Sequence, residues 1–190
     1  MRAVRNIKEF IVLLSFFVLI SCAAITPGKS VEQQPPQTLE DLINNKGSMT
    51  KALESLHRNL TVELLKNGVL ANEYVRISSL KLESMPVITA IVSTNVANPT
   101  FVNILRNAST TPIGKMLFAP GADIHRRDSM KIIVLTVHDI PNEVVHKYIN
   151  SLGYNDATHL VARKSEFYHQ TETMEITEYI LPSMTKYFSK

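Results

Sequence analysis

Extended segments rich in Val, Ile, Thr and Leu follow one another closely along this chain, and their spacing limits the fold more than any other feature. The predicted strands cover residues 60–65, 74–82, 87–94, 131–138, 159–168 and 174–181. Only turn signals such as Lys-Asn-Gly and Glu-Ser-Met-Pro separate the first three strands, so no crossover helix fits between them. Strands connected in this way pair as antiparallel neighbours.

Helical patterns lie before and between these strands. The predicted helices cover residues 39–43, 49–56, 98–107, 112–118 and 142–152. Thr38 and Ser48 precede the first two helices as capping residues, and Pro141 suits the N1 position of the last helix. Residues 121–128 are expected to form a polar loop. Residues 38–190 are enough for one domain with its own core, and we expect an α+β fold with helices packed on one side of an antiparallel sheet.

The N-terminus has the layout of an export signal. Three basic residues precede an apolar stretch of eleven residues, Phe10 to Ile20, which is too short to span a bilayer comfortably. The Leu-Ile-Ser-Cys segment that ends at Cys22 is similar to a bacterial lipobox, in which the signal is cut before the cysteine and the thiol carries a lipid. We therefore expect a lipoprotein signal peptide over residues 1–21. An ordinary signal peptide or an uncleaved anchor helix is the alternative.

Cys22 is the single cysteine of the sequence, which excludes a disulfide framework. Residues 22–37 are expected to be a polar, proline-bearing tether behind the lipidated Cys22. Ala23 stands where an aspartate would favour retention in the inner membrane, so we expect the protein at the outer membrane, facing the periplasm.

The charge of the chain changes when the signal is set aside. Without residues 1–21, 17 Lys and Arg residues remain against 16 Asp and Glu residues. A near-neutral domain offers no electrostatic footprint for nucleic acid. We expect a monomer that is held at a membrane through Cys22 and has a small molecule as its partner.

A carboxylate interrupts the apolar row of the last predicted strand. Strand alternation places Met174, Ile176, Glu178 and Ile180 on one face. A carboxylate in such a row is either paired with a cation or protonated, because burial disfavours its charged form. It marks a functional site or a structural ion pair, and the pattern leaves both open.

Arg76 is a candidate partner for Glu178. It lies on a polar and aromatic strand face with Tyr74 and Ser78, and its planar guanidinium can hold a carboxylate through two parallel hydrogen bonds. A solvated strand arginine is the alternative. Arg163 competes for Glu178, as a structural ion pair.

Other motifs that carry chemistry are weak or absent from the sequence. Ser48 and Lys51 match the Ser-x-x-Lys of penicillin-binding proteins, but no Lys-Thr-Gly or Ser-Asp-Asn follows and the domain is too small for that fold. The six histidines are dispersed, so we expect no metal site. The sequence has no Walker, Rossmann or Gly-x-Ser-x-Gly pattern.

Four short motifs, in this order, resemble those of the chorismate pyruvate-lyase family. They are Gly-Ser-Met-Thr-Lys at 47–51, Glu-Tyr-Val-Arg-Ile at 73–77, Thr-Pro-Ile-Gly-Lys at 111–115 and Thr-Glu-Tyr-Ile-Leu-Pro at 177–182. The resemblance runs over residues 42–187, most of the mature chain, and implies an antiparallel sheet with helical flaps over a buried pocket. Ala90-Ile91 stands where some members carry Gly-Arg.

The resemblance also implies a reaction and its residues. The family eliminates pyruvate from chorismate to leave 4-hydroxybenzoate, which predicts a carbon–oxygen lyase that needs no cofactor. Arg76 is implied as the residue that binds the ring carboxylate. Glu178 is implied as the catalytic residue, hydrogen-bonded to the oxygen at the opposite end of the ring. Met49 and Ile113 are implied as apolar walls of the substrate site.

Two other functions stay open. A non-catalytic lipoprotein could bind a small aromatic acid in the same pocket, and effector-binding modules of regulators share this general fold. A structural envelope lipoprotein would use the fold for protein contacts. Chorismate is made and used in the cytoplasm, so the export signal leaves the identity of the substrate open.

Overall fold

A computed structural model describes residues 35–188 of the chain. The signal peptide predicted for residues 1–21, the lipid site Cys22 and the first part of the tether lie outside the described residues. Within residues 35–188, no helix is long and apolar enough to cross a membrane.

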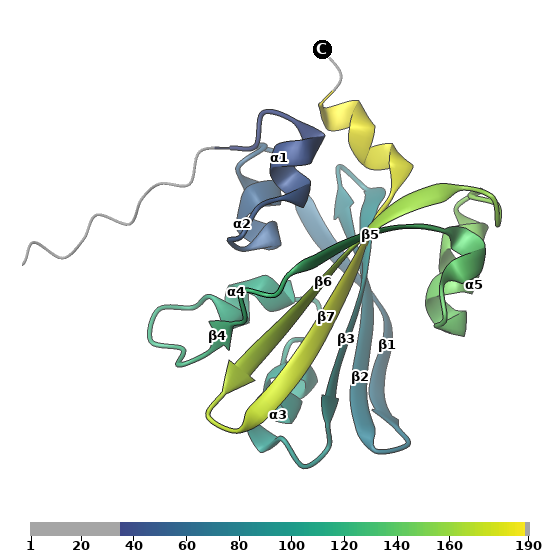
Figure 1. The fold of residues 1–190 in the computed structure, drawn as a ribbon. Helices are drawn as coiled ribbons and strands as arrows, with labels where there is room; N and C mark the ends of the chain where they lie inside the picture. The colour runs from purple at the N-terminus through teal and green to yellow at the C-terminus, as the bar shows by residue number, and fades with distance from the viewer. Residues whose placement is uncertain (1–34, 189–190) are drawn as a thin grey trace, which may run out of the picture. The chain divides into compact units, whose positions relative to one another are not determined.

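Seven strands of the described part of the chain form one antiparallel sheet (Figure 1). The strands are β1 Leu60–Leu70, β2 Glu73–Leu82, β3 Met85–Asn95, β4 His125–Arg126, β5 Lys131–Thr136, β6 His159–His169 and β7 Glu172–Ile180. Their order is β1-β2-β3-β7-β6-β4, and β5 also pairs with β6. The last hairpin, β6–β7, therefore inserts beside β3 and forms the middle of the sheet.

Two predictions about the strands were wrong in detail. β1 continues through the Lys-Asn-Gly segment that was predicted to be a turn, since a bulge between Leu64 and Lys66 lets the strand pass Gly68 in register with β2. The chain turns instead at Ala71, which has a positive φ of 52°. The short strand β4 lies in the segment 121–128, which was predicted to be a loop.

Five α-helices and two 3-10 helices accompany the sheet in the described residues. They are α1 Leu39–Ile43, α2 Met49–Glu54, α3 Pro99–Asn107, α4 Ile113–Leu117, α5 Glu143–Ser151, η1 Val137–Asp139 and η2 Pro182–Tyr187. Thr38 and Ser48 cap α1 and α2 as predicted, each accepting a backbone N–H bond. Pro141 lies one residue before the N-cap of α5 rather than at N1, because Asn142 takes the capping position and accepts from two backbone N–H groups.

The α+β class and the antiparallel sheet are confirmed, but the prediction that helices pack on one side was wrong. The first four helices lie on one face of the sheet, and α5 lies on the other (Figure 1). Val145 and Ile149 of α5 are buried against Ile77 of β2 and Tyr179 of β7. Strand residues that point away from α1–α4 are therefore also buried, and β2 and β3 carry buried residues on both faces.

Candidate ligand-binding site

Two rows of side chains cross the sheet beneath α2 and α4, and we call this side the cavity face. One row contains Arg76, Val92, Ile176 and Ser165, and the next contains Ser78, Ala90, Glu178 and Arg163. Residues that pair across antiparallel strands share a face, so the register alone brings these eight side chains together. Each row spans three strand spacings, about 14 Å.

A narrow cavity, open at its mouth, lies above these rows. Its floor includes Ala90, which lies between Ser78 and Glu178 in their row. Its walls come from α2, α4 and β4. All four residues singled out in the sequence lie in its lining, namely Met49, Arg76, Ile113 and Glu178. The structure thus brings the predicted positions together, while their roles in binding or catalysis stay predictions.

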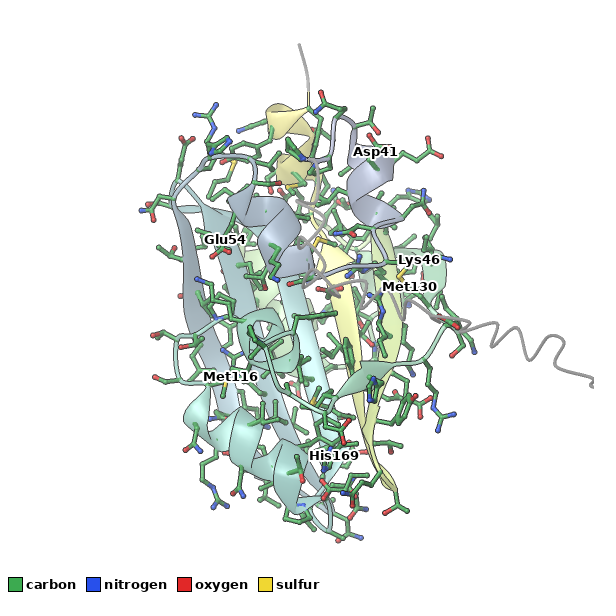
Figure 2. All side chains as sticks on the ribbon, turned by 90° about the vertical axis from the view of Figure 1, so that its left-hand side faces the viewer. Asp41, Lys46, Glu54, Met116, Met130 and His169 are labelled. Carbon is green, nitrogen blue, oxygen red and sulfur yellow. The ribbon has the colours of Figure 1, made fainter. Side chains whose placement is uncertain are left out.

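The helices α2 and α4 cover the cavity and pack closely on each other. Gly114 of α4 leaves no room for a side chain, because a Cβ there would lie 2.6 Å from Thr50 Oγ1 and 2.9 Å from Ser48 Oγ. Lys115 Nζ contacts Glu54 Oε1 of α2 at 2.7 Å. Figure 2 shows Glu54 on α2 above the helix that carries Met116. This close contact explains why glycine follows Ile113.

Arg76 occupies one end of the cavity as a buried cation. It is only 1% exposed, and its Nη1 donates to Ser78 Oγ at 3.1 Å. Its Nη2 donates to the carbonyl oxygens of Ser109 and Thr111 at 3.0 and 3.1 Å, in the segment between α3 and α4. Within residues 35–188 no carboxylate pairs with Arg76 and its Nε has no partner. Burial lowers the pKa of the Arg76 guanidinium, since the site solvates its charge poorly.

Glu178 forms the opposite end and is paired with Arg163. Arg163 Nε donates to Glu178 Oε2 at 2.8 Å, and the two side chains are 3% and 13% exposed. Arg163 Nη1 also donates to the carbonyl of Asn45 at 2.7 Å, in the segment between α1 and α2. Of the two arginines that the sequence left as candidate partners, Arg163 is thus the one that holds Glu178. Within residues 35–188, no hydrogen bond reaches the second oxygen, Oε1.

Two further polar residues of the lining were missed from the sequence. Arg126 comes from β4, is half-buried, and donates through Nη1 to the carbonyl of Gly47 at 3.3 Å. Ser165 is 4% exposed and its Oγ has no partner within the described residues. Alternation along β6 places Ser165 on the face of Arg163, so this pattern could have indicated it. No local pattern distinguishes Arg126.

The lining suits an organic acid better than a metal ion. Among residues 35–188, no three His, Cys, Asp or Glu side chains gather in a way that could hold a metal. The cavity instead offers a buried cation at one end, a carboxylate at the other and mainly apolar side chains between them. Ligand sites commonly have this make-up of apolar walls with a few polar groups. The free space is narrow, so a ring-sized ligand would have to part α2 and α4 from the sheet.

No protein-family model matches the sequence, and no curated protein matches it significantly. Distant structural similarities do exist. The C-terminal domain of the histidine utilization repressor from Pseudomonas syringae aligns with a TM-score of 0.46 and 7% identity, over 66% of this chain and 94% of that one. A ligand-binding domain assigned to the GntR family of transcriptional regulators, from Bordetella bronchiseptica, aligns with a TM-score of 0.44 and 11% identity, over 65% of this chain and 86% of that one.

YydK of Bacillus subtilis, described as a possible transcriptional regulator, aligns with a TM-score of 0.48 and 11% identity, over 67% of this chain and 60% of that one. Similarities at this level are too remote to carry an argument about function. The functional argument therefore rests on the residues of the cavity.

Proposed function

We propose that the cavity binds a small aromatic carboxylic acid, with the carboxylate of the ligand at Arg76. The observation that carries this proposal is the burial of the Arg76 cation without a carboxylate partner. A buried charge is costly unless it is paired, and an anionic ligand would supply the missing charge. Arg76 Nε, which has no partner within residues 35–188, would donate to that carboxylate.

The remaining lining suits the ring and a substituent opposite the carboxylate. Once α2 and α4 move away from the sheet, the ring would lie over Ala90, and Met49 and Ile113 would cover it from those helices. A ring hydroxyl would donate to Glu178, whose Oε2 is already held by Arg163. 4-Hydroxybenzoate has both groups at opposite ends of one ring and is therefore the first ligand to test.

The test is isothermal titration of the full-length protein with 4-hydroxybenzoate. Arg76→Met removes the cation but keeps an unbranched apolar side chain. We expect it to weaken binding about 10- to 100-fold, since a hydrogen bond to a charged group contributes about 1.5–3 kcal/mol. Glu178→Gln should weaken binding less, because the amide keeps an acceptor oxygen.

Arg58→Met is the matched control, because Arg58 is an exposed arginine that pairs with Glu83 outside the cavity. It should leave the dissociation constant unchanged. If Arg76→Met and Glu178→Gln both bind 4-hydroxybenzoate as tightly as the wild type does, the cavity is not a site for this class of acid.

Catalysis is a second candidate function, which the clustering of the four family-like positions around one cavity favours. In this reaction the ether bond between the ring and the enolpyruvyl group breaks and the ring loses a proton, so that 4-hydroxybenzoate forms, while the released enolpyruvate takes up a proton and becomes pyruvate. Arg76 would hold the ring carboxylate and Glu178 would hydrogen-bond the oxygen at the reacting end. Aromatisation drives the elimination, so positioning and charge would supply most of the rate.

Incubation of the same protein with chorismate decides between binding and turnover. Release of 4-hydroxybenzoate and pyruvate in equal amounts, lost in Glu178→Gln, would establish the lyase. Binding of 4-hydroxybenzoate without any release from chorismate would leave a ligand-binding protein. Binding is the first proposal because the predicted export signal would separate the cavity from cytoplasmic chorismate.

A further inference from the structure

The hydroxyl of Ser165 is a buried polar group that the proposed binding mode does not use. Ser165 is 4% exposed and lies in the cavity lining, and its Oγ has no hydrogen-bond partner within residues 35–188. Most buried hydroxyls in folded proteins are hydrogen-bonded, because an unpaired one loses its bonds to water without replacement. An unpaired hydroxyl in the wall of a cavity points to a partner on the ligand.

The sheet register places Ser165 beside Glu178. Ser165 pairs with Ile176, while Arg163 pairs with Glu178 in the next row. Ser165 and Glu178 are therefore diagonal neighbours on the same face, about 7–8 Å apart at Cβ. Arg76 lies at the far end of the row that contains Ser165. A ring that reaches from Arg76 to Glu178 would thus present its adjacent carbon to Ser165.

Arg126 adds a positively charged donor to the same corner. It lines the cavity from β4, and its Nη1 donates to the carbonyl of Gly47. Burial and the charge of Arg163 lower the pKa of Arg126, whereas Glu178 and Asp128 raise it. Arg126, Arg163 and Glu178 all line this one cavity.

We propose that Ser165 and Arg126 form a second polar subsite, which binds a ring hydroxyl adjacent to the one that faces Glu178. This hydroxyl would donate to Ser165 Oγ and accept from the Arg126 guanidinium. The preferred ligand would then be an aromatic acid with two neighbouring hydroxyls. The inference rests on the proposed function, because it needs the ligand carboxylate at Arg76 to set the position of the ring.

The experiment compares 4-hydroxybenzoate with 3,4-dihydroxybenzoate on the full-length protein by isothermal titration. We expect the wild type to bind the dihydroxylated acid about tenfold more tightly, as one added hydrogen bond to a charged group allows. Ser165→Ala and Arg126→Gln should each reduce that preference to about twofold or less. Both variants should lose less affinity for 4-hydroxybenzoate than for 3,4-dihydroxybenzoate.

Thr177→Ala is the matched control for loss of a hydroxyl. Thr177 is the chain neighbour of Glu178 on β7, and alternation directs it to the face opposite the cavity. Its loss should leave both dissociation constants unchanged. The Ser165→Ala change removes one oxygen only, and a circular dichroism spectrum equal to that of the wild type would show that the variant is folded.

Three results would overturn the inference, and they differ in whether the proposed function is also overturned. Equal affinity of the wild type for the two acids removes the second subsite but keeps the proposed function. A preference that survives in both Ser165→Ala and Arg126→Gln assigns the second hydroxyl to another part of the cavity. Failure of both acids to bind removes the proposed function together with the subsite.

Discussion

Arg76 and Arg163 are both buried, both point to the cavity face, and lie in adjacent rows of the same sheet, yet their surroundings differ. Arg163 has a carboxylate at 2.8 Å and a backbone carbonyl at 2.7 Å. Arg76 has one hydroxyl and two carbonyl oxygens, but no anion within the part of the chain that the structure describes. The first cation is neutralised inside the protein, and the second is only solvated by it.

The difference separates two uses of the same side chain. Neutral acceptors can replace part of the hydration of a guanidinium, but they do not cancel its charge. Burial accordingly lowers the pKa of Arg76. An internal ion pair such as Arg163–Glu178 stabilises the fold only when both partners are present. A buried cation without an anion is expected to favour the binding of an anionic ligand.

The largest expected effect tests whether Arg163 and Glu178 act as one unit. Arg163→Ala should lower the free energy of unfolding by about 3–5 kcal/mol, because it leaves a buried carboxylate without its cation. Urea denaturation followed by circular dichroism measures this. The double variant Arg163→Met with Glu178→Met removes both charges and should recover most of the loss. If Arg163→Ala is as stable as the wild type, Arg163 and Glu178 do not stabilise the fold as one unit, and the contrast with Arg76 fails.

A smaller effect is expected where the loop that holds Arg76 enters α4. Gly114→Ala would place a methyl group 2.6 Å from Thr50 Oγ1. We expect a net loss of about 1–2 kcal/mol, because the clash outweighs the gain of about 1 kcal/mol in helix propensity. Adding Thr50→Ala should recover part of that loss in the same denaturation assay. No recovery would show that α2 is not what limits the space at Gly114.

The smallest expected effect concerns the exposed ion pair of Glu63 and Lys81, which can be compared with the buried pair of Arg163 and Glu178. Glu63 accepts from Lys81 and from Tyr148, each at 2.9 Å, and its side chain is 43% exposed. Glu63→Gln should cost less than about 1 kcal/mol at neutral pH, because water screens such a pair.

The difference in free energy of unfolding between the wild type and Glu63→Gln should depend on pH in a definite direction. The hydrogen bond from Lys81, followed by that from Tyr148, lowers the pKa of Glu63 below its ordinary value of 4.5. The carboxylate therefore contributes its stability above pH 4.5 and loses it as the pH falls through the lower, folded-state pKa. Denaturation curves of wild type and Glu63→Gln should converge in acid. A difference that grows in acid would contradict this assignment.

Alternation along a strand was the most informative sequence signal for the site. It placed Glu178 in an apolar row, and the structure confirms that its neighbours Met174, Ile176 and Ile180 are buried. It did not decide which arginine pairs with Glu178. That choice depends on the register between β6 and β7 and on the place of β7 next to β3, which no local pattern encodes.

Other features were not predicted because they depend on contacts between residues that are far apart in the sequence. The extension of β1 depends on a bulge and on pairing with β2, which override the turn preference of its Lys-Asn-Gly segment. The connection from β5 to β6 places α5 on the second face of the sheet. The apolar periodicity of a helix is the same on either face, so the sequence pattern does not predict this choice. Arg126 reaches the cavity only because β4 pairs with the end of β6.

The alanine in the floor of the cavity also affects how well β3 suits a sheet. Alanine is disfavoured in strands compared with the β-branched residues that flank it two positions away on the same face, Ile88 and Val92. A valine at position 90 would match its neighbours and would fill the space over which the ring is proposed to lie. Strand propensity and an open cavity therefore favour different residues at position 90, and the alanine present there favours the cavity.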